Sequence, residues 1–136
     1  MADKVRQIDY YYVFVSNQPG KGLEVLTKLK EEKVNLLSST GFPVDGGRAQ
    51  LVLVPEKPDH LLKAAQKAGI TLSAKKEAFL VQGKDRFGAV AETFKKLADA
   101  NVNVHASNAT TSGGNYALIV WVKPRDVTAA AKALGL

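Results

Sequence analysis

Apolar and polar residues form two kinds of stretch along this chain, and the first half arranges them as strands and helices in a fixed order. The aromatic and β-branched run Tyr10–Val15 is typical of a strand. The stretch 21–33 that follows places apolar residues on one side of a helix and charged residues on the other. The further elements predicted are two strands, a helix and the start of a fourth strand, at 34–39, 49–54, 59–67 and 70–72.

The same order returns in the second half. The elements predicted there are a strand, a helix, two strands and a helix, at 77–82, 86–100, 102–110, 116–122 and 124–134. When the two halves are aligned by their glycines, identical residues occupy the pairs Gly20/Gly88, Glu24/Glu92, Lys28/Lys96, Leu29/Leu97, Val34/Val102 and Asn35/Asn103. Because this register runs through a helix and into the next strand, the chain is an internal duplication.

The order βαββαβ closes as an antiparallel sheet with both helices on one face. The sequence therefore predicts an α+β protein made of two ferredoxin-like βαββαβ units in tandem, packed as a pseudo-dimer. We place the first unit at 8–75 and the second at 76–136, with the second unit lacking or shortening its last strand. The first strand of that unit would then have an open edge, which residues 4–9 or a second chain could cover.

Each copy has a tight turn between its first strand and its first helix, namely Asn17-Gln18-Pro19-Gly20 and Asp85-Arg86-Phe87-Gly88. Such a turn presents backbone N–H groups and a helix N-terminus, which can hold an anion such as a carboxylate. At the same spacing after each glycine comes an asparagine, Asn35 or Asn103. Its side-chain amide can donate and accept hydrogen bonds, and we expect it at the same end of the sheet as the turn.

These turns, together with Val34-Asn35-Leu36 and Val102-Asn103-Val104, resemble motifs of the ACT family, which has N-x-P-G before the first helix and V-N-hydrophobic after it. The resemblance covers nearly the whole chain and is nearest to stand-alone proteins with two ACT domains and no catalytic domain. ACT domains are small ferredoxin-like modules that bind amino acids or similar ligands and regulate enzymes. The resemblance implies a ligand site between the turn and the start of the second strand, often at a contact between two domains.

The ligand-binding positions implied by the resemblance are found in both copies. They are Asn17, Gln18, Pro19, Gly20, Asn35 and Leu36 in the first copy, and Asp85, Phe87, Gly88, Asn103 and Val104 in the second. Some positions depart from the family pattern, because Phe87 replaces the proline, Gly22 a bulky apolar residue and Lys33 a glycine. Asn101, the counterpart of Lys33, can adopt the left-handed conformation that such a glycine provides.

Composition limits the chemistry, the cellular location and the partners that we expect for this chain. The absence of cysteine excludes disulfides, thiolate metal sites and a cysteine nucleophile, and it favours a cytoplasmic location. The N-terminus is charged, and we expect neither a signal peptide nor a membrane span. The net charge of +6 permits contact with nucleic acid or acidic ligands. Lysines alternate with glutamates along 24–33, however, which is typical of an ordinary solvated surface.

No catalytic pattern is visible, because the chain has no G-x-S-x-G motif, no Ser–His–acid order and no paired carboxylates. Neither His60 nor His105 has a second ligand at metal-binding spacing, so we expect no metal and no cofactor. Two alternatives to ligand binding remain. One is a purely structural association module; the other is a module like the RNA-recognition fold, in which aromatic residues of two strands stack on bases. Those residues would be Tyr10, Tyr12, Phe14 and Tyr116.

The function we expect is non-catalytic. A homodimeric protein would bind a small ligand, most simply an amino acid, and modulate a separate metabolic enzyme. The two copies should differ in affinity, because Asp85 favours an ammonium but repels a carboxylate, whereas Asn17 carries no charge. We therefore expect the first copy to be the stronger carboxylate site, and each ligand can touch both copies if the site lies at a domain contact.

Overall fold

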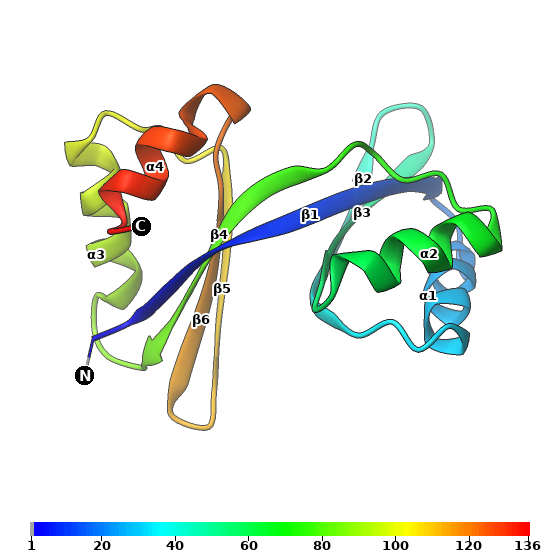
Figure 1. Cartoon of the computed structure of the whole chain (residues 1–136), viewed down its shortest axis with the longest axis horizontal. Coiled ribbons are helices and arrows are strands. Elements are labelled where there is room, and N and C mark those ends of the chain that lie inside the picture. Colours follow the sequence, from blue (N-terminus) through cyan, green and yellow to red (C-terminus); the bar gives the residue numbers. More distant parts are fainter. Residues whose placement is uncertain (1) are drawn as a thin grey trace. The chain divides into compact units, whose positions relative to one another are not determined.

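The first strand, β1 (Lys4–Ser16), contributes to both units into which the chain divides. The computed structural model describes residues 2–136. One unit consists of Asp9–Lys76 and is called the first unit below. The second unit joins the segment that ends at Ile8 to Glu77–Leu136. The fold is α+β, as predicted, with two ferredoxin-like units of antiparallel strands and helices (Figure 1).

In the first unit the strand order is β2-β3-β1, with β3 antiparallel to both neighbours. Its other elements are α1 (Lys21–Glu31), β2 (Leu36–Val44), β3 (Arg48–Pro55) and α2 (Pro58–Ala68). Alternate residues of β1 point to the helices, so Tyr11 and Val13 are buried in a core with Leu29, Leu53 and Leu61. This burial of one sheet face against two amphipathic helices holds the unit together.

In the second unit the strand order is β1-β4-β6-β5, with β6 antiparallel to β4 and to β5. Its elements after β1 are β4 (Lys76–Lys84), α3 (Ala89–Asp99), β5 (Ala106–Ser112), β6 (Asn115–Trp121), the 3-10 helix η1 (Pro124–Asp126) and α4 (Val127–Ala133). The core is formed by Phe79, Val81, Leu97, Leu118 and Val120, which are almost completely inaccessible to solvent. Each unit therefore has a hydrophobic core of its own.

The start of β1 lies where the second unit lacks its own last strand. β1 is the hydrogen-bonded neighbour of β4, and the segment up to Ile8 belongs to the second unit. Figure 1 shows the beginning of β1 beside the end of β4, with the two strands running in opposite directions. Ile8 is buried and Val5 packs against the second core. The edge that the sequence left open is thus covered by this chain itself.

The fourth strand predicted to start at 70–72 in the first unit is wrong, because residues 69–75 form no regular strand. This segment still runs beside β1: the N–H of Ser73 donates to the carbonyl of Tyr12 over 2.9 Å, and the N–H of Tyr12 donates to Ser73 Oγ over 3.0 Å. A side-chain hydroxyl takes the place of a main-chain carbonyl here, so the ladder does not continue as a regular strand.

The boundaries of other elements also differ from the prediction. β1 begins six residues before Tyr10, and β5 begins at Ala106 instead of 102. The reason at 102 is local, since the N–H of Val102 donates to the carbonyl of Leu97 over 2.9 Å and so closes the end of α3. The equivalent bond from Val34 to Leu29 is also 2.9 Å, which shows that the duplication extends to individual hydrogen bonds.

Both helix ends need a residue in the left-handed conformation just before this bond. Lys33 and Asn101 occupy those positions, each with φ of 58°. Asparagine tolerates this region, whereas a lysine side chain is strained there by about 1–2 kcal/mol. Because lysine replaces the glycine of the family pattern at position 33, the first unit has a local backbone strain that the second unit lacks.

We expect Lys33→Gly to stabilise the first unit by about 0.5–1 kcal/mol, because the relief of strain exceeds the extra freedom that glycine gives the unfolded chain. The matched variant Asn101→Gly should change stability by less than about 0.5 kcal/mol. Urea unfolding of both variants measures the two effects. An equal gain from both variants would show that Lys33 carries no special strain.

Candidate functional site

The two turns have the same backbone geometry. Gly20 and Gly88 precede α1 and α3 in the left-handed conformation, with φ of 87° and 77°. Each glycine carbonyl accepts the first bond of its helix over 3.0 Å. Neither helix start has a side-chain cap, so N–H groups of the first helical turn are left for another acceptor.

A hairpin tip holds the beginning of each turn. The N–H of Asn17 donates to the carbonyl of Gly47 over 2.9 Å, and the N–H of Asp85 donates to that of Gly114 over 3.0 Å. A Cβ added at Gly20 or Gly88 would meet no heavy atom within 4 Å. Space above both glycines is therefore open, and a substitution there acts through backbone strain and through the bulk it adds to this space.

At the second turn this space is part of a cavity of about 490 Å³. Its walls are the turn, the first residues of α3 and the end of β5, with Tyr116 of β6 as a further contributor. The lining residues include Asp85, Gly88, Val90, Thr110 and Thr111. The cavity thus combines a carboxylate, two threonines and the start of a helix within one unit, at a size common for small-molecule sites.

Arg86 also lines this cavity, but its donors are occupied. Its guanidinium donates to both oxygens of Asp3 over 3.1 Å, to Glu92 over 3.0 Å and to the carbonyl of Lys84 over 3.0 Å. It also lies over the ring of Tyr116, at 5.7 Å from the centroid. Arg86 therefore ties the N-terminal segment to the turn, and the charge it offers to a ligand is largely neutralised.

Asp3 is the centre of this arrangement, which we call the Asp3 latch (Asp3, Arg86, Glu92 and Tyr116). The hydroxyl of Tyr116 donates to Asp3 over 2.6 Å. A side chain on Gly83 in β4 would collide with the Asp3 carboxylate, so the glycine makes room for it. Burial of Tyr116, followed by its hydrogen bond to Asp3, raises the pKa of this tyrosine to about 12.

Hydrogen bonds from Arg86 lower the pKa of Asp3 below its ordinary value of 3.8, and the bond from Tyr116 adds to this against the opposing effect of burial. A lowered pKa in the folded state means that the latch stabilises the protein above pH 3.8 and loses this contribution as the pH falls further. We expect Asp3→Asn to cost about 1–2 kcal/mol near neutral pH and progressively less in acid.

Urea unfolding at neutral pH and at about pH 2.5 would measure this difference. Asp99→Asn is the control, since Asp99 pairs over 2.7 Å with Lys95 in an exposed ion pair on α3. Such a pair contributes at most about 1 kcal/mol. A cost of Asp3→Asn that did not change with pH would contradict an ionised Asp3 in the latch.

The expectation that each asparagine lies at the same end of the sheet as its turn is wrong. At one end Ser16 pairs with Arg48, whereas at the other Leu36, which follows Asn35, pairs with Pro55. These ends are about 23 Å apart along β3 at the usual rise of a strand. The reason is that α1 carries the chain back along the sheet before β2 begins.

The second copy repeats this separation. Asp85 follows Lys84, which pairs with Asn115, whereas Asn103 precedes Ala106, which pairs with Trp121 at the far end of β6. Within one unit, the structure therefore brings the turn together with the β5–β6 hairpin and not with the asparagine. The turn Ser112-Gly113-Gly114-Asn115 predicts a hairpin from the sequence. Antiparallel pairing across it would have placed Thr110, Thr111 and Tyr116 beside the second turn, so these residues were predictable although the sequence analysis did not name them.

The other predicted site residues divide by exposure. Gln18 and Pro19 are exposed in the first turn, and Phe87 is fully exposed in the second. Leu36 and Val104 are partly buried and pack against the first and the second core. Packing explains these last two residues without a ligand.

The alternative of base stacking loses one of its residues, because Tyr116 is only 4% exposed and lies in the second core. Phe14 is exposed, and Cζ of Arg48 lies over its ring at 4.3 Å from the centroid. His60 and His105 are both exposed, and residues 2–136 contain no group of three acidic, histidine or cysteine side chains placed to hold a metal ion. No helix in this part of the chain is long and apolar enough to cross a membrane.

Proteins of known structure share this fold. A protein from Bacteroides thetaiotaomicron matches with a TM-score of 0.82 and 16% identity, over 96% of this chain and 88% of that one. The ligand-free regulatory subunit of aspartate kinase from Thermus thermophilus matches with a TM-score of 0.65 and 16% identity, over 97% and 93%. The corresponding subunit from Thermus flavus matches with a TM-score of 0.62 and 18% identity, over 98% of this chain and 93% of that one.

No family model matches the chain, and no curated protein matches its sequence. At the identities given above, the likeness concerns the fold. It confirms that the chain has the tandem ferredoxin-like architecture that its resemblance to ACT domains implied.

Proposed function

We propose that this protein binds a free amino acid at the turns that begin α1 and α3, and that binding regulates a separate metabolic enzyme. The observation that carries the proposal is the cavity at the second turn. There an amino acid would find the Asp85 carboxylate for its ammonium group and the N–H groups of the first turn of α3 for its carboxylate. Gly88 allows close approach to this backbone, because it has no side chain.

The first turn offers the same backbone geometry with the neutral side chain of Asn17 in place of Asp85. It repels a carboxylate less, so we propose that it is the stronger carboxylate site of the two. The residues of this site are Asn17, Gln18, Pro19 and Gly20. Asn35 and Asn103 are left out of both sites, since each lies at the other end of its unit.

A regulatory role is supported by the chains that share the fold, two of which are regulatory subunits of aspartate kinase in Thermus species. Those subunits have lengths similar to this chain, which covers 93% of each. In this proposal the protein is not itself an enzyme and acts in the cytoplasm.

We also propose a homodimer. β5 is an edge strand whose seven residues, Ala106–Ser112, are all exposed and carry no charge. Exposed edges are usually protected by charge or proline, so this one suits pairing with a second copy. Light scattering should give twice the chain mass of 14.6 kDa. A monomer at high concentration would contradict the proposal.

Isothermal titration calorimetry with free amino acids tests the ligand and its location. We expect Asn17→Asp to weaken the tighter binding, because it gives the first turn the charge that Asp85 gives the second. Asp85→Ala should weaken the other site by about tenfold or more, as the loss of a charged hydrogen bond would. Asp99→Ala, which removes an exposed carboxylate at the far end of α3, is the control and should bind as the parent does. Binding unaffected by either turn variant would place the ligand elsewhere.

A further inference from the structure

A second cavity, of about 390 Å³, lies in the second unit apart from the cleft between the turn and β5. Its walls come from the start of β1, from β4, from α3 and from the end of the chain after α4. Val5, Val81 and Leu134 provide an apolar part of the lining, whereas Thr93 and Lys96 of α3 are polar. None of the residues predicted from the sequence to bind ligand lines it.

Thr93 is the first residue of the lining that indicates a ligand site. Its side chain is polar, yet the residue is buried, with 4% exposure. The position equivalent to it in the first unit, by the same register that aligns Gly20 with Gly88, is Val25. Valine and threonine have the same shape, so packing does not require a hydroxyl here. A hydroxyl that costs free energy to bury is useful where it can meet a polar group of a ligand.

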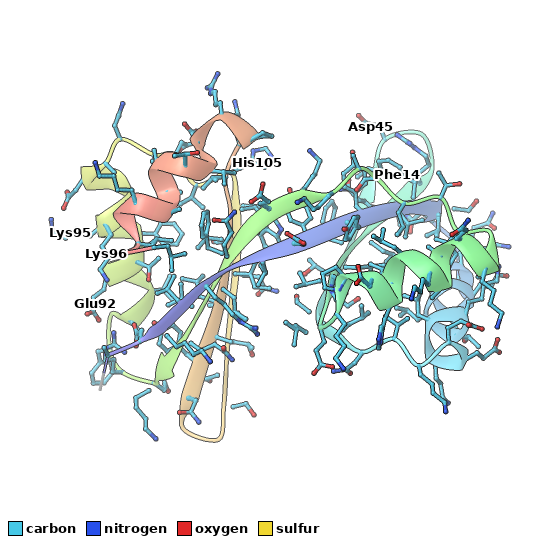
Figure 2. The ribbon with its side chains drawn as sticks, in the orientation of Figure 1. Phe14, Asp45, Glu92, Lys95, Lys96 and His105 are labelled. Carbon is cyan, nitrogen blue, oxygen red and sulfur yellow. The ribbon has the colours of Figure 1, made fainter. Side chains whose placement is uncertain are left out.

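The charges at the cavity have both signs. Arg86 is paired with Asp3 over 3.1 Å and with Glu92 over 2.9 Å. Lys96 helps to lower the pKa of Asp3 but forms no ion pair with any residue in the range 2–136. Glu92 and Lys96 both project from α3 (Figure 2). The charges of Arg86 and Lys96 balance those of Asp3 and Glu92, so the net charge of the lining is zero. The site therefore favours neither a pure anion nor a pure cation.

We propose that this cavity is a further amino-acid site, distinct from the cavity at the second turn although Arg86 lines both, that takes an amino acid with an aliphatic side chain. The inference rests on the proposed function and names a second location and a ligand class for it. The ligand carboxylate would lie at Lys96 and Thr93, and its ammonium at Glu92, of which Oε2 bonds to Arg86 and leaves Oε1 for the ligand. Its side chain would cover Val5, Val81 and Leu134, which supply the apolar surface.

A ligand in this cavity would act on the Asp3 latch. Ala2, Asp3 and Val5 line the cavity, so binding holds the start of β1 against α3. Arg86 lines this cavity and also the cavity at the second turn. An amino acid in one cavity therefore touches the same guanidinium as an amino acid in the other, which is a physical route for coupling between the two sites.

The test is an NMR titration of the ¹⁵N-labelled full chain with L-leucine. We expect amide shifts at Val5, Thr93 and Leu134, and an affinity that falls by about tenfold or more in Lys96→Gln. Lys28→Gln is the matched control, because Lys28 is the equivalent lysine in the first unit. Thr93→Val should also weaken binding while leaving the protein folded, since the first unit has valine at this position. The analogues 4-methylpentanoate and 3-methylbutylamine, each lacking one charge of leucine, should both bind more weakly.

Equal affinities in Lys96→Gln and Lys28→Gln, or leucine shifts confined to residues 85–91 and 109–111, would overturn this site and leave the proposed function standing. Binding of polar amino acids alone would do the same. Failure of every one of the twenty amino acids to bind would overturn the proposed function itself. Tighter binding of either analogue than of leucine would show that the cavity does not select a zwitterion.

Discussion

Removal of residues 2–8 is expected to unfold the second unit and leave the first unit folded. These residues supply the strand beside β4, the buried Ile8 and the partly buried Val5, and they contain Asp3 of the Asp3 latch. Loss of two apolar side chains from a core costs about 1.5–3 kcal/mol each, and loss of the charged hydrogen bonds costs about 1–2 kcal/mol more. The sum of about 4–8 kcal/mol is comparable to the whole stability of a unit of this size.

Trp121 is the single tryptophan of the chain and lies in β6, so its fluorescence reports on the second unit. We expect the truncated chain to show an unfolded tryptophan spectrum, while amide resonances of residues 9–76 remain dispersed. The control is the double variant Lys4→Ser with Arg6→Ser, which changes two exposed residues of the same strand. It should alter stability by no more than about 0.5 kcal/mol. Native tryptophan fluorescence after truncation would contradict the role assigned to β1.

Leu29→Ala and Leu97→Ala should each destabilise only the unit in which they lie. These leucines are equivalent in the duplication and are 2% and 0% exposed in the two cores. Truncation of a buried leucine leaves a cavity and costs about 3–5 kcal/mol. Urea unfolding followed by amide resonances of both units would show one unit shifted and the other unchanged.

Leu62→Ala is the control for these variants, since Leu62 is 44% exposed on α2. It should cost about 1 kcal/mol or less. The same experiment tests the predicted division of the chain at 75/76. Loss of both units together in either variant would mean that the chain unfolds as one cooperative body.

The repeat made most of the fold predictable from the sequence. Identical residues in register, such as Leu29/Leu97 and Val34/Val102, reflect identical hydrogen bonds at the two helix ends. Gly69 and Gly135 end their helices in the left-handed conformation, as a glycine after a helix indicates. Periodicity and turn residues report on local structure, and most of a ferredoxin-like fold follows from the order of local elements.

The sequence-based prediction of the site was wrong where it depended on which end of the sheet a residue reaches. A helix of eleven residues reverses the chain, so that Asn35 and Gly20 lie at opposite ends of the unit even though they flank the same helix. The pairing of the first residues of β1 with β4 brings together positions 70 or more residues apart, such as Gln7 and Glu77, and no local pattern specifies it. The latch residues Asp3 and Arg86 are likewise far apart in the sequence and meet only through that pairing.

The central claim is that a free amino acid binds at a turn between strand and helix. An NMR titration of the labelled wild-type chain with each of the twenty amino acids tests this most directly. We expect at least one amino acid to shift the amide resonances of residues 17–21 or 85–91 in a saturable way. No saturable shift at either turn with any of the twenty would contradict the claim.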